Sequence, residues 1–217
     1  MTDRLARQSE FAYAPSRDPS DAVNNAPKTT TLTLGILAGG RATRLGGIDK
    51  AWIERDGVAQ VLRIARRFTP EVDGVLVSTN RDPSRHVAHG LLPVADIRAD
   101  TGPIGGLEAL AHACSTQWLL TIPVDLIGLN DCLLPSLQFA AVANGAFAED
   151  DDGPQPLVAL WRADALLAAA SAAIDARDFA VHSLQARLGM ACVRFAGVRF
   201  GNLNTADDLT ASGFSLP

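Results

Sequence analysis

An apolar segment near the start of the chain changes abruptly into glycine and positive charge. Residues 31–50 read TLTLGILAGGRATRLGGIDK, so four glycines, two arginines, an aspartate and a lysine follow the run that ends at Ala38. Glycines let the backbone approach a ligand closely and turn its N–H groups towards an anion, and an arginine can bind two phosphate oxygens at once. These residue types predict a loop that binds a polyphosphate.

The spacing within this loop differs from two common phosphate-binding motifs. A P-loop needs a lysine followed by serine or threonine, whereas Lys50 is followed by Ala51. The dinucleotide-binding pattern GxGxxG is also absent from the stretch, because the glycine pair 39–40 is followed by the pair 46–47. From these residues alone, a glycine-rich turn with solvated basic side chains remains the alternative.

The rest of the chain alternates short apolar runs with amphipathic or alanine-rich stretches. The apolar runs predict strands at 31–38, 74–79, 91–95, 118–124, 157–161 and 191–196. The stretches with helical spacing predict helices at 58–68, 104–114, 130–143, 162–175 and 178–188. Strands separated by helices of about ten residues indicate an α/β fold with a doubly wound, mostly parallel sheet.

The length of 217 residues suits a single domain. Residues 1–30 are rich in Pro, Ser, Asp and Asn, and they contain no apolar core like that of a secretory signal. We therefore expect a loose N-terminal tail over 1–30 and one folded domain over 31–217.

In a sheet of this kind, ligands bind beyond the carboxyl ends of the strands. The segments that follow the predicted strands contain glycines, amides, carboxylates and one lysine, at 39–50, 80, 96–106, 125 and 202–205. Asp125 directly follows the buried strand predicted at 118–124, so its carboxylate should emerge at this edge. The fold rule and the polar residues thus predict the same site.

Charge and composition exclude several classes of function. A net charge of −5 is unfavourable for a protein that binds nucleic-acid backbones. The apolar runs are far shorter than the roughly 18 residues of a membrane span. Cys114, Cys132 and Cys192 form no CxxC pair, and we expect them to be reduced thiols in a core. We expect a soluble cytoplasmic protein without nucleic-acid or membrane partners.

Two other groups of ionisable residues do not predict metal sites. His86 and His89 lack a third ligand nearby, so we interpret them as a solvated pair. The acidic run EDDDG at 149–153 is more typical of a solvated loop than of a cation cage, which needs ligands from several directions.

Four motifs resemble those of one enzyme family. LAGGRATRLGGIDK at 37–50 resembles LAGGxxxRMGGxDK, the signature of the molybdenum cofactor guanylyltransferases in the molybdopterin nucleotidyltransferase family. DTGPIGGLEAL at 100–110 resembles the family's GPLAG segment, IPVD at 122–125 its strand ending in a metal-binding aspartate, and NLNTADDL at 202–209 its NxNTPEEL segment. The resemblance spans about residues 33–210 and implies a Rossmann-like sheet of the nucleotidyltransferase type.

The resemblance also implies which residues bind the nucleotide. The purine and ribose would be held by Leu37, Ala38, Gly39 and Gly40. Asp96 aligns with a nucleotide-contacting aspartate, with a one-residue gap before Gly102.

The catalytic and acceptor residues are implied in the same way. Arg44 and Lys50 would meet the triphosphate, and Asp125 would contact the nucleotide and hold Mg²⁺. Asn202 and Asn204 would face the acceptor. No histidine or cysteine nucleophile is needed, because catalysis would rest on positioning and electrostatics.

The function implied by the resemblance is transfer of GMP from GTP to molybdopterin, or molybdenum cofactor, with release of pyrophosphate. Molybdoenzymes or cofactor-delivery proteins would be candidate recipients of the product. The alternatives are a related transferase that uses CTP or a sugar or polyol phosphate acceptor, and a non-catalytic nucleotide-binding regulator. The pair Gly39–Gly40 favours guanine, because cytidylyl relatives tend to read LAAG at this point.

Several positions depart from the family pattern. Leu126 and Ile127 replace a Thr-Pro pair, Gln155 and Leu157 replace a histidine and a threonine, and Ser78 replaces an asparagine. These positions are expected near the acceptor, so the donor side matches the family more closely than the acceptor side.

Overall fold

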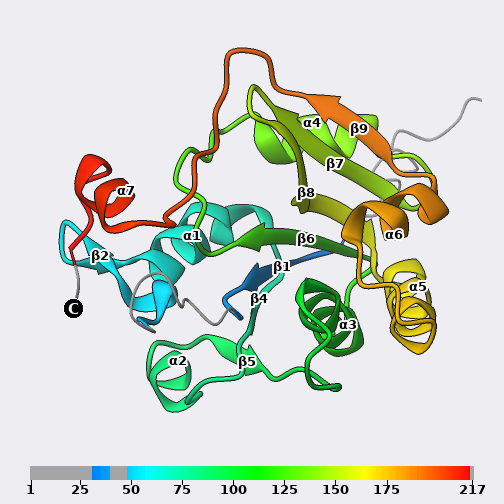
Figure 1. Ribbon diagram of the computed structural model, residues 1–217, viewed down its shortest axis with the longest axis horizontal. Coiled ribbons are helices and arrows are strands. Elements are labelled where there is room, and N and C mark those ends of the chain that lie inside the picture. The colour runs from blue at the N-terminus through cyan, green and yellow to red at the C-terminus, as the bar shows by residue number, and fades with distance from the viewer. Residues whose placement is uncertain (1–30, 40–47, 216–217) are drawn as a thin grey trace, which may run out of the picture.

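The computed structural model describes residues 31–39 and 48–215 (Figure 1). Its main sheet has seven strands in the order β5-β4-β1-β6-β8-β7-β9. These strands are β1 (Leu32–Leu37), β4 (Gly74–Ser78), β5 (Leu92–Val94), β6 (Trp118–Pro123), β7 (Gly145–Asp150), β8 (Gly153–Arg162) and β9 (Ala191–Arg194). A separate hairpin is formed by β2 (Glu54–Arg55) and β3 (Val58–Ala59).

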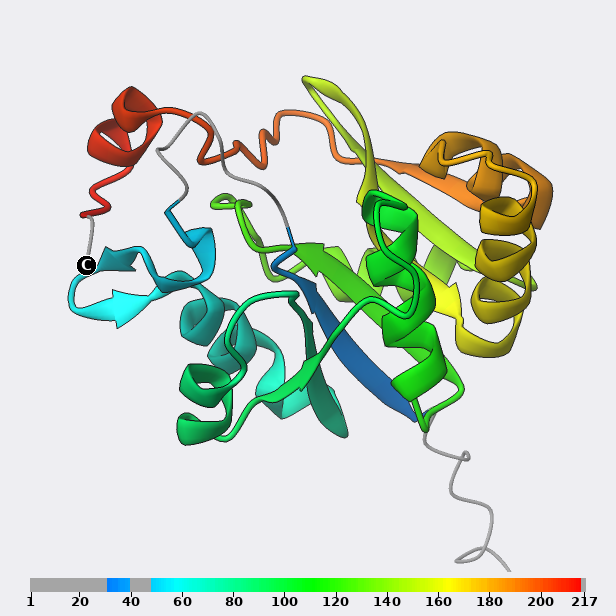
Figure 2. The ribbon, with the colours of Figure 1, turned by 60° about the horizontal axis from the view of Figure 1, so that its bottom comes forward.

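Helices cover both faces of this sheet, while the last helix packs beside the hairpin through Leu209 and Ile53 (Figures 1 and 2). They are α1 (Gln60–Phe68), α2 (Ser84–Ala88), α3 (Pro103–Ala113), α4 (Leu133–Ala140), α5 (Ala163–Asp175), α6 (Val181–Leu188) and α7 (Ala206–Ala211), with short 3-10 helices η3 (Lys50–Trp52) and η4 (Thr69–Glu71). Among the residues that the structure describes, no helix has the length and apolar character needed to cross a membrane.

The central strand β1 contributes to two hydrophobic cores because its side chains alternate between the faces of the sheet. Leu34 and Ile36 pack in the core that includes α1 and α4, and Leu37 packs in the core that includes α3, α5 and α6. Every residue of β1 is buried, as expected for a strand covered on both faces. This arrangement confirms the predicted doubly wound sheet.

The sheet is mixed rather than wholly parallel. Strand β1 pairs in parallel with β4 and β6, and β5 pairs in parallel with β4. Strand β8 is antiparallel to both β6 and β7, while β9 is parallel to β7. The half from β5 to β6 is therefore wholly parallel, and it contains the strand ends at which the sequence predicts the site.

Strand β7 is absent from the predicted elements, and its position changes the interpretation of the acidic run. Asp150 ends this strand and is fully buried. Its carboxylate accepts hydrogen bonds from the Phe200 amide at 2.8 Å, the Asp152 amide at 2.9 Å and Gln155 Nε2 at 3.1 Å. Burial raises the pKa of Asp150, but these hydrogen bonds outweigh it and the pKa is lowered overall. The prediction of a solvated loop is wrong for Asp150.

Two further expectations about individual side chains are corrected. His86 is fully buried against Trp52, with ring centroids 4.9 Å apart, so it is not half of a solvated pair. Cys132 and Cys192 are exposed, so the expectation of core thiols is wrong for them. All three cysteines are free thiols, as expected.

Candidate active site

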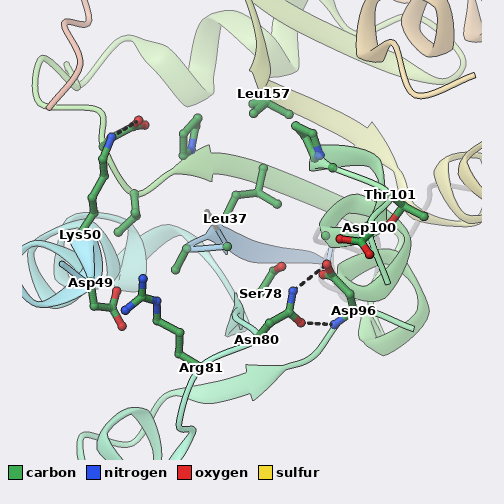
Figure 3. Close-up of a pocket in the computed structure, with 18 of the residues that line it drawn as sticks. Leu37, Asp49, Lys50, Ser78, Asn80, Arg81, Asp96, Asp100, Thr101 and Leu157 are labelled. Atoms are coloured by element: carbon green, nitrogen blue, oxygen red, sulfur yellow. Dashed lines mark hydrogen bonds and ion pairs between the residues drawn. The ribbon is translucent and has the colours of Figure 1, made fainter. Parts of the chain in front are cut away.

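The carboxyl ends of β1, β4 and β6 open into one cavity of about 1270 Å³ (Figure 3). Of the residues predicted for the site, those that line it are Leu37, Ala38, Gly39, Lys50, Asp96 and Asp125. Gly40 and Arg44 lie outside the described residues, so their predicted roles stay predictions. The cavity therefore lies at the sheet edge expected from the fold rule.

The floor of the cavity is the end of β1, held by the strands on either side. The Ala38 amide donates to Ser78 O at 2.9 Å, and the Val124 amide donates to Leu37 O at 3.0 Å. Among the described residues, the nearest neighbour of a Cβ atom added to Gly39 would be Ser78 Oγ, 3.9 Å away. The glycine thus leaves open space directly beyond the strand, where a ligand can approach the backbone.

The helix that begins within the GPIGG segment, α3, packs tightly against the same strand ends. A Cβ atom at Gly106 would lie 2.8 Å from Ser78 Oγ and 3.0 Å from Leu37 Cδ2. At Gly105 it would lie only 2.1 Å from Thr101 Oγ1. Gly106 therefore allows α3 to approach the cavity floor this closely, whereas Gly105 leaves room for Thr101 in the loop that precedes the helix.

A charged cluster occupies one side of the cavity. Lys50 Nζ donates to Asp125 Oδ2 at 3.2 Å and to Asn204 Oδ1 at 2.9 Å. Lys50 begins η3, which is capped by Asp49 through a 3.0 Å hydrogen bond from the Ala51 amide. The Lys50 and Asp125 side chains are 18% and 26% exposed, so the pair is accessible to a ligand but partly shielded from solvent screening.

The segment that carries Asn204 is tied to the end of β6. The Leu203 amide donates to Asp125 O at 2.9 Å, and Asn202 forms an antiparallel bridge with Leu126. Asp208 forms a capping box with Thr205 at the start of α7. The pKa of Asp208 is lowered, mainly by a hydrogen bond with the Thr205 side chain and further by those from the Asn204 and Thr205 amides. Asn204 is therefore placed beside the charged pair, whereas Asn202 lies at the bridge to Leu126; both are exposed, and neither lines the cavity.

The opposite side of the cavity contains a second polar pair (Figure 3). Asn80 Nδ2 donates to Asp96 Oδ2 at 2.8 Å, and the Asp96 amide donates back to Asn80 Oδ1 at 2.9 Å. No other hydrogen bond reaches the Asp96 carboxylate from the described residues, which leaves an acceptor oxygen for a ligand. Arg81 extends along the wall towards Asp49 (Figure 3), and it is missing from the predicted set although it directly follows Asn80.

The positions that depart from the family pattern have different surroundings. Ser78 and Leu157 line the cavity, so they contribute directly to its shape. Gln155 instead donates to the buried Asp150, and Leu126 is buried in the core. Only some of the positions that differ from the family pattern therefore face the candidate site.

Comparison with known sequences matches the MobA-like NTP transferase domain over residues 34–188. The molybdenum cofactor guanylyltransferase of Burkholderia orbicola is 35% identical over 203 residues, which cover 86% of this chain and 97% of that protein. The protein of the same name from Cereibacter sphaeroides is 37% identical over 180 residues, covering 80% and 91%.

Solved structures show the same fold at low sequence identity. Molybdopterin-guanine dinucleotide biosynthesis protein A from Archaeoglobus fulgidus aligns with a TM-score of 0.64 at 17% identity, covering 83% of this chain and 96% of that one. The 2-C-methyl-D-erythritol 4-phosphate cytidylyltransferase from Thermus thermophilus aligns with a TM-score of 0.59 at 14% identity, covering 82% and 96%. With the match over residues 34–188 and relatives above 30% identity over most of their length, the chain belongs to the MobA-like NTP transferase domain family.

Proposed function

We propose that the protein transfers GMP from GTP to molybdopterin, forming the guanine dinucleotide cofactor and releasing pyrophosphate. The observation that carries this proposal is the Lys50–Asp125 pair in a cavity beyond the glycine end of β1. It occurs in a chain that is similar, over most of its length, to relatives named molybdenum cofactor guanylyltransferase.

The two polar sides of the cavity suit the two ends of a nucleotide. The base and ribose would lie over Leu37, Ala38 and Gly39, with the triphosphate extending towards Lys50. The base would then meet the Asp96 carboxylate. In its ionised form this group can accept hydrogen bonds but cannot donate them. Guanine presents two adjacent N–H donors on one edge, whereas the corresponding edge of cytosine presents acceptors beside its amino group. A carboxylate at this position therefore favours GTP over CTP.

The proposed reaction joins two phosphates. An oxygen of the acceptor phosphate attacks the α-phosphorus of GTP, the bond between that phosphorus and the bridging oxygen of the β-phosphate breaks, and pyrophosphate leaves. A phosphate monoester is largely ionised at neutral pH, since its second pKa is about 6, so no strong general base is required. Lys50 offsets the charge that develops on the phosphoryl oxygens.

The donor atoms beside Lys50 fit a divalent cation of the Mg²⁺ type. Mg²⁺ is commonly bound through one or two carboxylates together with substrate phosphates. The described residues contain no group of three His, Cys, Asp or Glu side chains that could hold a metal alone, which agrees with an ion that shares its ligands with a nucleotide. Asp125 would hold this ion, which when bound stabilises negative charge on the phosphates.

The alternative functions have less support. A non-catalytic regulator would not require the Lys50–Asp125–Asn204 cluster in addition to a nucleotide pocket. A cytidylyltransferase shares the fold at 14% identity, whereas the relatives from Burkholderia orbicola and Cereibacter sphaeroides, at 35% and 37% identity, carry the guanylyltransferase name.

Pyrophosphate release tests the proposal. The protein is incubated with Mg²⁺, molybdopterin and each nucleoside triphosphate in turn, and GTP is expected to give the fastest release. Asp125→Asn keeps the shape of the side chain but removes its charge, so it should abolish metal-dependent release with little change in melting temperature. Faster release with CTP would overturn the guanylyl assignment, and full activity of Asp125→Asn would mean that another residue holds the ion.

A further inference from the structure

One wall of the cavity is an irregular loop between β5 and α3. Its lining residues are Asp96, Ile97, Ala99, Asp100, Thr101 and Gly102. Asp100 has a φ of 57° and Gly102 a φ of 63°, so the backbone passes twice through the left-handed region that most residues avoid. A wall of this kind has no helix or sheet hydrogen bonds to keep its shape, so side chains must hold it in place.

Arg98 does not line the cavity, and it ties this loop to the helices behind it. Its Nη2 atom lies 3.0 Å from Glu108 Oε1 in α3, and its Nη1 atom lies 2.5 Å from Asp175 Oδ1 at the end of α5. The Thr101 hydroxyl donates to Arg98 O at 3.0 Å, so the anchor also reaches the second half of the loop.

Glu108, the inner partner of Arg98, is almost completely buried. Only 2% of this residue is exposed, and its Oε1 atom also accepts a 2.7 Å hydrogen bond from Ser171 Oγ. Its Oε2 atom is buried and has no hydrogen-bond partner among the described residues. A buried carboxylate with an unpaired oxygen is a costly way to join two helices.

The helices α3 and α5 do not depend on this ion pair for their contact. Leu107 and Leu110 of α3 share a hydrophobic core with Leu166 and Ala170 of α5. Replacing a buried ion pair by apolar residues of similar volume often leaves stability unchanged or raises it. What the ion pair adds is therefore a fixed position for Arg98 and for the loop on either side of it.

We propose that Arg98 and Glu108 are positioning residues for the nucleotide: they hold the loop from Asp96 to Gly102 in the shape that receives the base. Asn80 fixes one end of this wall through its two hydrogen bonds to Asp96, and the Arg98–Glu108 pair fixes its middle. This inference rests on the proposed function, because it assigns the wall to nucleotide binding.

The test replaces both charges at once, so that no buried charge is left without its partner. The double variant Arg98→Met/Glu108→Leu is expected to melt at the wild-type temperature or above it. Its Kd for GTP should rise about tenfold, because the loop is no longer held. Its kcat at saturating GTP should remain that of the wild type, because Lys50 and Asp125 lie on the other side of the cavity. Calorimetric titration, thermal unfolding and steady-state kinetics give the three values.

Two further variants complete the test. Arg98→Lys keeps the positive charge but cannot bind Glu108 and Asp175 at the same time, so it should raise the Kd for GTP by less than the tenfold expected of the double variant. This single variant keeps the inference testable if the double variant folds poorly. Arg187→Met, which removes the exposed ion pair with Asp178 away from the cavity, is the matched control and should leave the Kd unchanged.

The outcomes separate the inference from the proposed function. If the wild type binds GTP and both Arg98 variants bind it equally well, the positioning role is overturned. A large fall in melting temperature with an unchanged Kd for GTP would also overturn it, because the pair would then be purely structural. If the wild type does not bind GTP, the proposed function fails and the inference fails with it.

Discussion

Lys50 is held by two side chains that come from distant parts of the chain. Asp125 follows β6, and Asn204, 154 residues further along the chain than Lys50, precedes α7. The positions of Lys50 and Asp125 at the sheet edge could be predicted, because each follows a recognisable strand or loop motif. The contact with Asn204 could not, because it depends on how the C-terminal segment returns across the sheet.

Replacing Lys50 tests its role in the reaction. An ammonium group that offsets new charge acts more strongly in the transition state than in the ground state. Lys50→Ala should therefore lower kcat by about 10²–10³-fold, the usual effect of losing one preorganised donor, with a smaller loss of GTP affinity. Lys50→Arg should recover little, because the planar guanidinium is longer and aimed differently. In steady-state kinetics, an effect confined to KM would show that Lys50 only binds substrate.

The open space at Gly39 gives a second prediction at this scale. Because the nearest atom of the described residues to an added Cβ is 3.9 Å away, Gly39→Ala should fold normally and keep the wild-type melting temperature. The new methyl group would occupy the space proposed for the nucleotide, so the affinity for GTP should fall about tenfold, the same size as other small losses of fit in a pocket. Calorimetric titration measures this, and unchanged affinity would place the nucleotide elsewhere in the cavity.

At the scale of elements, the sequence predicts the long, strongly patterned segments best. Helix α5 is expected at 162–175 and is found at Ala163–Asp175, and the strand expected at 118–124 is β6, Trp118–Pro123. Strand β7 escapes prediction because it reads GAFAED, which lacks the β-branched residues typical of strands. Helix α2 is only five residues long, too short for a helical repeat to be visible.

The packing of α2 on η3 predicts a pH dependence of stability. The indole of Trp52, two residues after Lys50, contacts the rings of His86 and His89. The Arg85 Cζ atom lies 4.2 Å from the centre of the same indole ring. Burial lowers the pKa of His86 below its ordinary value of 6.5. The negative charge of Asp49 acts in the other direction, but the effect of burial is larger. Below pH 6.5 the unfolded chain therefore takes up a proton more readily than the folded one, so the free energy of unfolding decreases as the pH falls.

Removing the buried imidazole should remove this effect. Urea unfolding at pH 7 and pH 5 should show a smaller loss of stability for His86→Leu than for the wild type, whatever the variant's stability at pH 7. His112→Leu, at an exposed position on α3, is the control and should keep the wild-type pH dependence. Equal losses for the wild type and His86→Leu would assign the pH dependence to other groups.

At the scale of the whole molecule, two cores share one sheet. Strands β1 and β6 contribute side chains to both cores, so neither core can unfold without disrupting the other. The described elements from β1 onward contain the whole sheet and the cavity. The domain assignment of residues 31–217 remains a prediction, and it can be tested directly.

A variant that contains residues 31–217 alone should unfold in one cooperative transition with a melting temperature close to that of the full chain. It should also keep the full activity with GTP, because no described residue of the cavity precedes Leu37. Differential scanning calorimetry and the pyrophosphate assay measure both properties. Two separate transitions, or loss of activity, would contradict the single-domain assignment.

The most direct test of guanylyl transfer follows the α-phosphate of GTP. The protein is incubated with Mg²⁺, molybdopterin and GTP labelled at the α-phosphate, and the products are identified by mass spectrometry. We predict that the label appears in a molybdopterin–guanine dinucleotide and that one pyrophosphate is released for each molecule formed. Label that remains in GTP, or that appears only as free GMP whether or not molybdopterin is present, would contradict the proposed function.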